Sequence, residues 1–151
     1  MQVWRLVPEE RADTAFTGFG AWKFGGRWNP KGYTVAYLAE NLALAALEQY
    51  VHLPPAARGK AFLAYRVTFP ETIAADQLAS LPSDWEAEPV PASTQEAGRA
   101  WLEGEGRSGL LSVPSVVVPQ ERNLMADLSH PDWQQAKIAE PERFVFDPRM
   151  R

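Results

Sequence analysis

Short apolar runs rich in β-branched and aromatic residues recur along the chain, and glycine, proline or polar residues bound each of them. Runs of this kind are typical of β-strands that pack against a core. Because Pro114 cannot donate to a strand ladder, the run around it is expected to end, bulge or lie at an edge. We expect strands over residues 3–7, 33–39, 61–69, 109–118 and 143–146.

Residues 41–53 have the pattern of a largely buried helix with one polar stripe. Asn41 is a suitable N-cap, and the proline pair at 54–55 would stop the helix. At the helical periodicity, Glu48, Gln49 and His52 share one sector of the surface. The stripe could face water or a cleft, and the pattern alone leaves both open.

A second helix is expected to begin at Ser93, with Glu96 as its capping-box partner, and to continue through the segment AGRAWLEGE. A shorter helix is expected after Pro131. The Pro- and Glu-rich segment 81–91 has the composition of an exposed loop. No repeat or long linker divides the chain, so we expect a single α+β domain over residues 1–151.

The composition excludes several classes of site. The 46% of apolar residues are enough for a proper core, and the absence of cysteine excludes disulfides, a thiolate nucleophile and a cysteine-based zinc site. His52 and His130 have no distinctive acidic or metal-ligating partners, so we expect neither a metal centre nor a Ser-His-Asp triad. The N-terminal segment lacks the features of a signal peptide, and no run could span a bilayer, so we expect a cytoplasmic protein.

Charge divides the chain into two unequal halves. Residues 1–70 carry eight Lys/Arg and five Asp/Glu, whereas residues 71–151 carry seven Lys/Arg and fourteen Asp/Glu. The first half is therefore at +3, the second at −7, and the whole chain at −4. An acidic chain lacks the broad basic face of a general nucleic-acid-binding protein, but its basic half suits a small anionic ligand.

The segment FGGRWNPKGY, residues 24–33, concentrates glycine around one arginine. Backbone amides at Gly25 and Gly26, with Arg27 beside them, would form a cradle for a phosphate or pyrophosphate group. A hairpin with an exposed arginine is the alternative. The spacing does not match a P-loop, and a strand follows where a P-loop or Rossmann turn would have a helix.

Three further polar residues stand out in apolar surroundings. Tyr37 precedes Glu48 by eleven residues, so a strand and a helix joined by one tight turn would bring both to the same cleft. The carboxylate of Glu48 would there interact strongly with a nearby cation. Ser115 follows the strand-breaking Pro114, where its hydroxyl could enter a site or satisfy a local backbone group.

The order of these elements carries a specific resemblance. The stretch GFGAWKFGGRWNPKGYTVAYLAENLALAALEQYVH, followed by VPSVVVPQERN, HPDW and FVFDPR, closely resembles the RES domain family, named for its Arg, Glu and Ser. The resemblance covers nearly the whole chain. It implies a fold similar to that of ADP-ribosyltransferases, with a mixed, mainly antiparallel sheet and flanking helices.

The same resemblance implies a function and partners. Members of the family are toxins of bacterial toxin–antitoxin pairs that attack NAD, and an Xre-type helix-turn-helix antitoxin neutralises them. NAD would then be a substrate, and no prosthetic group is expected. DNA binding would belong to the antitoxin, and the toxin could oligomerise within the complex.

Residue roles follow from the positions that match the family motifs. The resemblance implies a catalytic group comprising Arg27, Tyr37, Glu48 and Ser115. It implies that the NAD-binding residues are Gly25, Gly26, Arg27, Trp28, Asn29, Tyr37 and Asn123. Ser129, which precedes the HPD segment, competes with Ser115 for the serine role.

Cleavage of the nicotinamide–ribose bond builds oxocarbenium character on the ribose, which a fixed carboxylate stabilises. Glu48 is the expected carboxylate. Transfer to water would make the chain an NAD glycohydrolase, which is our first expectation, and transfer to inorganic phosphate would make it a phosphorylase. Transfer to a protein would make it an ADP-ribosyltransferase. A module that binds nucleotides without catalysis is the alternative from another class.

Overall fold

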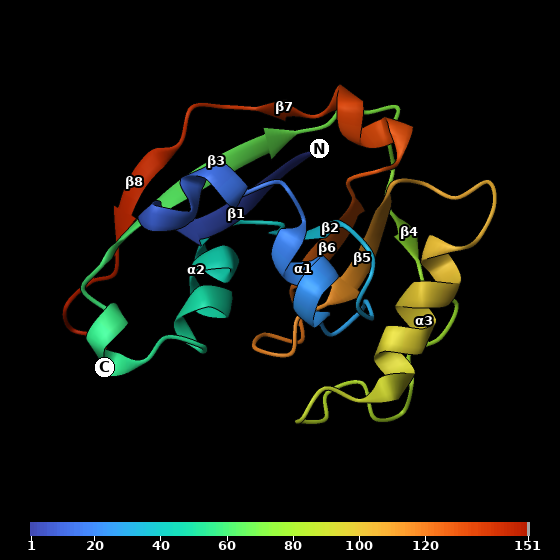
Figure 1. The fold of residues 1–151 in the computed structure, drawn as a ribbon, viewed down its shortest axis with the longest axis horizontal. Helices are drawn as coiled ribbons and strands as arrows, with labels where there is room; N and C mark the ends of the chain where they lie inside the picture. The colour runs from blue at the N-terminus through green and yellow to red at the C-terminus, as the bar shows by residue number, and fades with distance from the viewer. Residues whose placement is uncertain (151) are drawn as a thin grey trace.

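The computed structural model describes residues 1–150, which form one mixed sheet with helices at both ends. The strand order is β4-β5-β6-β2-β1-β3-β7, and β8 also pairs with β3 (Figure 1). All strand pairs are antiparallel except the parallel pair β4 and β5. The strands are β1 (Gln2–Pro8), β2 (Val35–Ala39), β3 (Ala61–Thr68), β4 (Asp76–Gln77), β5 (Leu110–Pro114), β6 (Arg122–Asp127), β7 (Lys137–Ile138) and β8 (Glu142–Val145).

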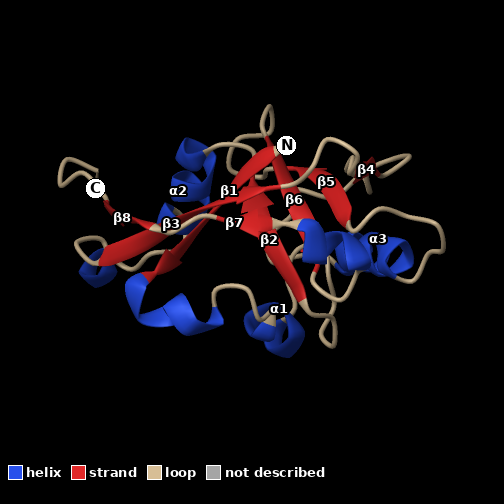
Figure 2. Cartoon of the chain, turned by 90° about the horizontal axis from the view of Figure 1, so that it is seen from above, coloured by secondary structure: helices blue, strands red, loops and turns tan. Residues whose placement is uncertain are grey.

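Three α-helices and three short 3₁₀ segments connect these strands within the described residues. Helix α2 packs at the β1 and β3 end of the sheet, and α3 lies at the β4 end (Figures 1 and 2). The α-helices are α1 (Phe19–Phe24), α2 (Leu42–Tyr50) and α3 (Ala92–Leu102). The 3₁₀ segments are Glu9–Thr14, Pro55–Ala57 and Pro131–Gln135.

The α+β class and the mainly antiparallel sheet expected from the sequence are confirmed. The Asn41 cap is also confirmed, because its side chain accepts a hydrogen bond from the Leu44 amide at 2.8 Å. Helix α2 ends at Tyr50, earlier than expected. The strand expected over 109–118 ends at Pro114, which lacks the amide that a longer ladder would need.

The expected start of α3 is wrong. Pro91 is the N-cap residue, and Ser93 lies inside the first turn, where its hydroxyl donates to the Asp84 carboxylate. Glu96 pairs with Arg99 along the helix surface, so no capping box forms. The sequence analysis also missed α1 and β6.

The sheet is weakly joined between β1 and β2. Strand β1 pairs with β3 along its whole length, and β2 pairs with β6 along its whole length. Between β1 and β2, by contrast, the only registered pair in residues 1–150 is Trp4 with Ala39. The two halves of the sheet therefore diverge at this point. One apolar cluster packs mainly against β1 and β3 and another against β2, β5 and β6, while a third cluster joins both halves through Val3 and Leu38.

Candidate active site

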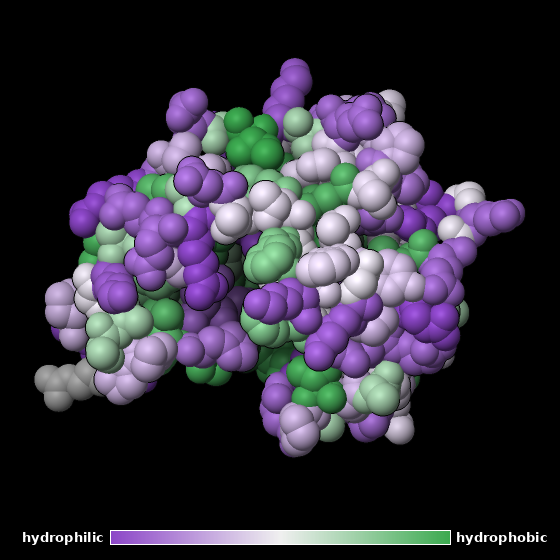
Figure 3. All heavy atoms as spheres, in the orientation of Figure 1, coloured by the Kyte–Doolittle hydropathy of each residue, from purple (hydrophilic) through white to green (hydrophobic). Residues whose placement is uncertain are grey.

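A cleft of about 860 Å³ opens where the two halves of the sheet diverge. Figure 3 shows a hollow between the part of the molecule that carries α2 and the part that carries α1. Its volume is typical of small-molecule sites. The residues that line it are Trp4, Arg5, Leu6, Gly26, Arg27, Trp28, Tyr37, Leu38, Ala39, Ala45, Glu48, Gln49, Val51, His52, Glu88, Val90, Val113, Pro114, Val116, Val117 and Asn123.

The polar stripe of α2 faces this cleft. Glu48, Gln49 and His52 all line it, which decides between the two orientations that the sequence left open. Leu44, one turn before Glu48, packs in an apolar cluster with residues of β1 and β3. The helix therefore presents its carboxylate to a partly apolar cavity.

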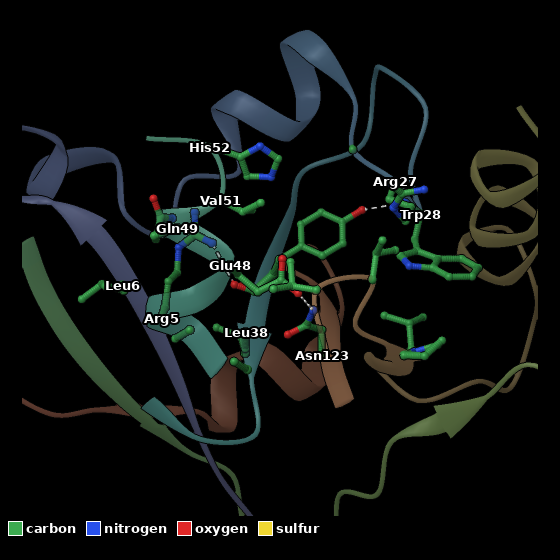
Figure 4. Close-up of a pocket in the computed structure, with 18 of the residues that line it drawn as sticks. Arg5, Leu6, Arg27, Trp28, Leu38, Glu48, Gln49, Val51, His52 and Asn123 are labelled. Carbon is green, nitrogen blue, oxygen red and sulfur yellow. Dashed lines mark hydrogen bonds between the residues drawn. The ribbon is translucent and has the colours of Figure 1, made fainter. Parts of the chain in front are cut away.

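Glu48 is held by two side chains that come from distant parts of the chain. Its Oε1 accepts a hydrogen bond from the Ser115 hydroxyl at 2.7 Å. It also accepts one from the Asn123 amide at 2.7 Å (Figure 4). Within the described part of the chain, Oε2 makes no hydrogen bond and is not enclosed. One oxygen of the carboxylate is thus fixed, and the other is available to a ligand.

The ends of β5 and β6 place these two donors. Pro114 ends β5, and the next residue, Ser115, is fully buried, with 0% of its surface exposed. The Ser115 hydroxyl also accepts a hydrogen bond from the Val118 amide at 2.9 Å, which fixes its orientation. Asn123 lies on β6 opposite Val113 of β5, so the strand that the sequence analysis missed delivers the amide.

Ser129 does not compete for this position. Its hydroxyl donates to Oδ1 of Asp127 at 2.7 Å, whereas the Ser115 hydroxyl donates to Glu48. Neither serine is itself among the residues that line the cleft. Geometry therefore favours Ser115 as the serine of the site.

Tyr37 forms a wall of the cleft, and its hydroxyl is fully occupied. The hydroxyl donates to Oδ1 of Asn29 at 2.7 Å and accepts from the Trp28 amide at 3.1 Å. Burial raises the pKa of Tyr37, so the phenol stays protonated at neutral pH. A side chain at position 26 could not fit, because a Cβ on Gly26 would lie 2.8 Å from the tyrosine hydroxyl.

The glycine-rich segment has a different role from the expected cradle. The Gly25 amide donates to Ala21 at 2.9 Å, and the Gly26 amide donates to Asn29 at 2.9 Å. Gly25 ends α1 with a φ of 76°, a conformation that glycine adopts without strain. The amides that we expected to receive a phosphate are therefore used inside the protein.

Trp28 and Asn29 are buried in the protein interior, where they support the fold. Trp28 is 2% exposed and packs in the core with Val35 and Leu102. Asn29 is 0% exposed, and its amide nitrogen donates to the carbonyls of Ala21 and Pro30 at 3.1 and 3.0 Å. Neither Asn29 nor Gly25 lines the cleft, whereas Gly26, Trp28 and Arg27 do.

Arg27 lies at the cleft but already has partners. Its Nη1 donates to the carbonyls of Trp85 and Ala87, both at 2.9 Å, and its Nη2 pairs with the carboxylate of Glu88. The arginine side chain is 14% exposed and the Glu88 side chain 66% exposed. The segment 81–91 therefore contacts the site at its mouth, and Glu88 is the partner that can leave.

Sequence reasoning missed a second arginine, Arg5. It rises from the middle of β1, where its Nε donates to the Ala15 carbonyl at 2.7 Å and its Nη1 to the Tyr37 carbonyl at 2.9 Å. Burial lowers the pKa of Arg5 to about 10, so it remains a cation at neutral pH. The signal in the sequence was a charged residue inside the apolar strand VWRLV.

The positions of the acidic residues and histidines decide whether the described part of the chain has the arrangement that a metal site needs. No group of three or more His, Cys, Asp or Glu in residues 1–150 is arranged to hold a metal ion. His130 caps the 3₁₀ segment that follows it, because its Nδ1 accepts from the Asp132 amide at 3.1 Å.

No helix within residues 1–150 is both long and apolar enough to cross a membrane.

Proteins similar to this chain are described as toxins. A protein of Yersinia enterocolitica named Toxin Res is 37% identical over 153 residues, and the alignment covers 100% of both chains. A protein of Sphingobium named Prs ADP-ribosylating toxin is 36% identical, with 97% of this chain and 94% of the relative covered.

A solved structure from the Mycobacterium tuberculosis MbcT–MbcA toxin–antitoxin complex shares the fold, with a TM-score of 0.70. That alignment covers 95% of this chain and 84% of the other at 19% identity, so it shows likeness of fold alone. The family model described as RES domain matches residues 2–147, which is nearly the whole chain. With this match and the two full-length relatives, the chain belongs to the RES domain family.

Proposed function

We propose that this protein is the toxin of a bacterial toxin–antitoxin pair and that it cleaves the nicotinamide–ribose bond of NAD. The observation that carries the proposal is the Glu48 carboxylate, fixed through one oxygen by Ser115 and Asn123 and open through the other to the cleft. Membership of the RES family and relatives named as toxins support the same function.

The chemistry needs a fixed negative charge beside the ribose. When the C1′–N bond breaks, its electron pair leaves with nicotinamide, which departs neutral, and positive charge develops on the ribose. The free Oε2 of Glu48 would stabilise that charge or bind the ribose hydroxyls. Because nicotinamide leaves as a neutral base, no general acid is needed, and one carboxylate is sufficient.

The surrounding residues would bind and orient the dinucleotide. Tyr37 would wall in the nicotinamide or ribose with its ring, since its hydroxyl is held by Trp28 and Asn29. Arg27 would contact the pyrophosphate after Glu88 turns away into solvent. Ser115 acts through Glu48 in this geometry and is a positioning residue.

Water is the acceptor that we favour. Its oxygen would add to C1′ as nicotinamide leaves, and the loss of one proton would give ADP-ribose. Inorganic phosphate would give the phosphorylated sugar instead. A second candidate is transfer to a protein side chain, which is favoured by the Sphingobium relative with ADP-ribosylating in its name.

The partner we propose is an antitoxin of the Xre helix-turn-helix type, in line with the family resemblance and with the toxin–antitoxin complex that shares this fold. Its binding would cover the cleft and exclude NAD. A complex in which NAD still reaches Glu48 freely would contradict inhibition by steric cover.

The test is nicotinamide release from NAD by wild-type protein and by Glu48→Gln, without antitoxin, with products identified by mass spectrometry. We expect the substitution to lower turnover by about 10² to 10³ or more, the scale of one preorganised electrostatic contact. Glu71→Gln is the matched control, because Glu71 is exposed and outside the cleft. The product shows whether water, phosphate or protein accepts the ADP-ribosyl group.

Intact NAD after prolonged incubation with folded wild-type protein would overturn the proposal. If that protein still bound NAD, the chain would be a nucleotide-binding module without catalysis. Equal turnover by wild type and Glu48→Gln would remove Glu48 from the reaction.

A further inference from the structure

We propose that Gln95 of α3 is a positioning residue for NAD cleavage. Its side chain fixes the peptide group between Gly26 and Arg27 and thereby sets where Arg27 meets the ligand. The inference rests on the proposed function, in which Arg27 binds the pyrophosphate. Gln95 is not among the residues that line the cleft, so it would act through the loop that carries Arg27.

One face of α3 packs against the glycine-rich segment. Gln95, Gly98 and Leu102 are spaced three and four residues apart, so they lie on the same face of the helix. The Gln95 amide donates to the Gly26 carbonyl at 3.0 Å. Gly98 lies against the Trp28 carbonyl, and Leu102 packs in the same apolar cluster as Trp28. This helix face therefore supports the loop on both sides of Arg27.

The contact with Gln95 completes the hydrogen bonding of Gly26. The Gly26 amide donates to the Asn29 carbonyl at 2.9 Å. Within residues 1–150, the donor to the Gly26 carbonyl is the Gln95 side chain. With both polar groups bonded, the two peptide planes that flank Gly26 are fixed. The second of these planes contains the backbone nitrogen of Arg27, so its orientation sets the direction in which the arginine leaves the loop.

The glycine makes this external support necessary. A Cβ at position 26 would lie 2.8 Å from the Tyr37 hydroxyl, so the loop needs a residue without a side chain beside the tyrosine. Glycine has the least restricted backbone of all residues, and it leaves the chain free to rotate just before Arg27. The hydrogen bond from Gln95 limits that rotation without placing an atom in the space that Tyr37 occupies.

The side chain and the backbone of Arg27 are held by one continuous stretch of chain. Nη1 donates to the carbonyls of Trp85 and Ala87, which belong to the segment 81–91, and α3 follows that segment directly. In Figure 4 Arg27 lies on the side of the cleft next to the ribbon of α3. An arginine held in this way loses less conformational freedom when it binds a phosphate group, which favours binding.

The test is the kinetics of nicotinamide release by wild type and Gln95→Met. Methionine keeps the length and the helix propensity of the side chain but removes the donor. We expect the KM for NAD to rise about three- to tenfold, the scale of one hydrogen bond, with kcat little changed. Glu96→Met is the matched control, because Glu96 is the exposed neighbour on α3 and lies outside the cleft, and its KM should stay at the wild-type value.

A double-mutant cycle separates positioning from a general loss of stability. In Arg27→Ala the pyrophosphate has lost its arginine, so adding Gln95→Met should change KM by less than about twofold. A merely structural Gln95 would lower the free energy of unfolding and leave KM unchanged, or would raise KM by the same factor with and without Arg27. Either of these results overturns the inference.

Gln95→Asn covers the case in which Gln95→Met does not fold. Asparagine keeps the polar amide but is one methylene shorter, so its nitrogen no longer reaches the Gly26 carbonyl. KM should rise as expected for Gln95→Met, and the rise should again be absent with Arg27→Ala. An unchanged KM in Gln95→Asn would overturn the inference.

Failure of the inference and failure of the proposed function give different results. If the Gln95 variants keep the wild-type KM while NAD cleavage still depends on Glu48, the inference is overturned and the proposed function stands. If the wild type binds ADP-ribose but cleaves no NAD, the proposed function fails, and calorimetric Kd values for ADP-ribose replace KM in the same cycle. Absence of both cleavage and binding overturns both.

Discussion

The hydroxyl of Ser115 donates to Oε1 of Glu48 at 2.7 Å, although the two residues are 67 positions apart in the chain. The same hydroxyl accepts from the Val118 amide, so the serine joins the loop after β5 to the carboxylate of α2. This contact, with the matching one from Asn123, sets the direction in which the free oxygen of Glu48 points.

We expect Ser115→Ala to lower kcat for NAD cleavage about tenfold with little change in KM, because Asn123 still holds Glu48. The free energy of unfolding should fall by about 1 to 2 kcal/mol, since the Val118 amide loses its acceptor. Steady-state kinetics and denaturant unfolding measure the two effects. Ser112→Ala, in strand β5 just before this loop, is the control, and its kcat should match the wild type because the Ser112 hydroxyl accepts a hydrogen bond from Arg122 and does not contact Glu48.

Glu88 competes with the ligand for Arg27. We expect Glu88→Gln to lower the KM for NAD by about two- to fivefold, because a solvent-exposed ion pair contributes at most about 1 kcal/mol. Glu86→Gln removes the same charge from the same exposed loop but lies outside the cleft, so its KM should stay at the wild-type value. An unchanged or higher KM in Glu88→Gln would show that Glu88 is not the partner that a ligand displaces.

The raised pKa of Tyr37 should make the free energy of unfolding fall in alkaline solution. Its pKa in the folded state lies above the value of about 10 for an unfolded tyrosine, so its contribution is complete below pH 10 and is lost as pH rises further. Denaturant unfolding of wild type and Tyr37→Phe between pH 7 and 11 measures this. The variant should be less stable by about 1 to 2 kcal/mol at pH 7, and the difference should narrow above pH 10. A constant difference would contradict the raised pKa.

Gly98 allows α3 to pack against the backbone of Trp28. A Cβ at this position would lie 1.6 Å from the Trp28 carbonyl oxygen, so the helix and the turn that carries Trp28 would have to separate. We expect Gly98→Ala to lower the free energy of unfolding by about 3 kcal/mol, as overpacking does. Thermal unfolding measures the change.

Gly20→Ala is the control for that substitution. It lies in α1, and a Cβ there meets nothing within 4 Å. Alanine should therefore leave stability unchanged or raise it by about 0.5 to 1 kcal/mol. If Gly98→Ala and Gly20→Ala unfolded at the same temperature, the close approach of α3 to Trp28 would not limit the size of the residue at position 98.

Local pattern in the sequence was enough for the elements that are governed by local chemistry. The apolar runs predicted β1, β2, β3 and β8, and Asn41 predicted the start of α2, because side-chain alternation and capping depend on near neighbours. The family motif also singled out Glu48 and Ser115, which the fold brings into contact.

Tertiary contacts decided the rest. The sequence analysis missed β6, whose segment begins with Arg-Asn and is a strand because it pairs on both sides with β2 and β5. The amides of the glycine segment were expected to face a ligand, but the segment instead surrounds the buried hydroxyl of Tyr37. These strand pairs and hydrogen bonds join groups that are distant in the sequence and otherwise lack a partner. A local run of residues therefore does not predict them.

The polar stripe of α2 and the charge of Arg5 show the same difference between what the local sequence predicts and what tertiary contacts decide. The sequence by itself determined that Glu48, Gln49 and His52 share a helix face and that Arg5 interrupts an apolar strand. Only the tertiary structure decided that both features border one cleft, because that cleft exists where β1 and β2 diverge after a single registered pair.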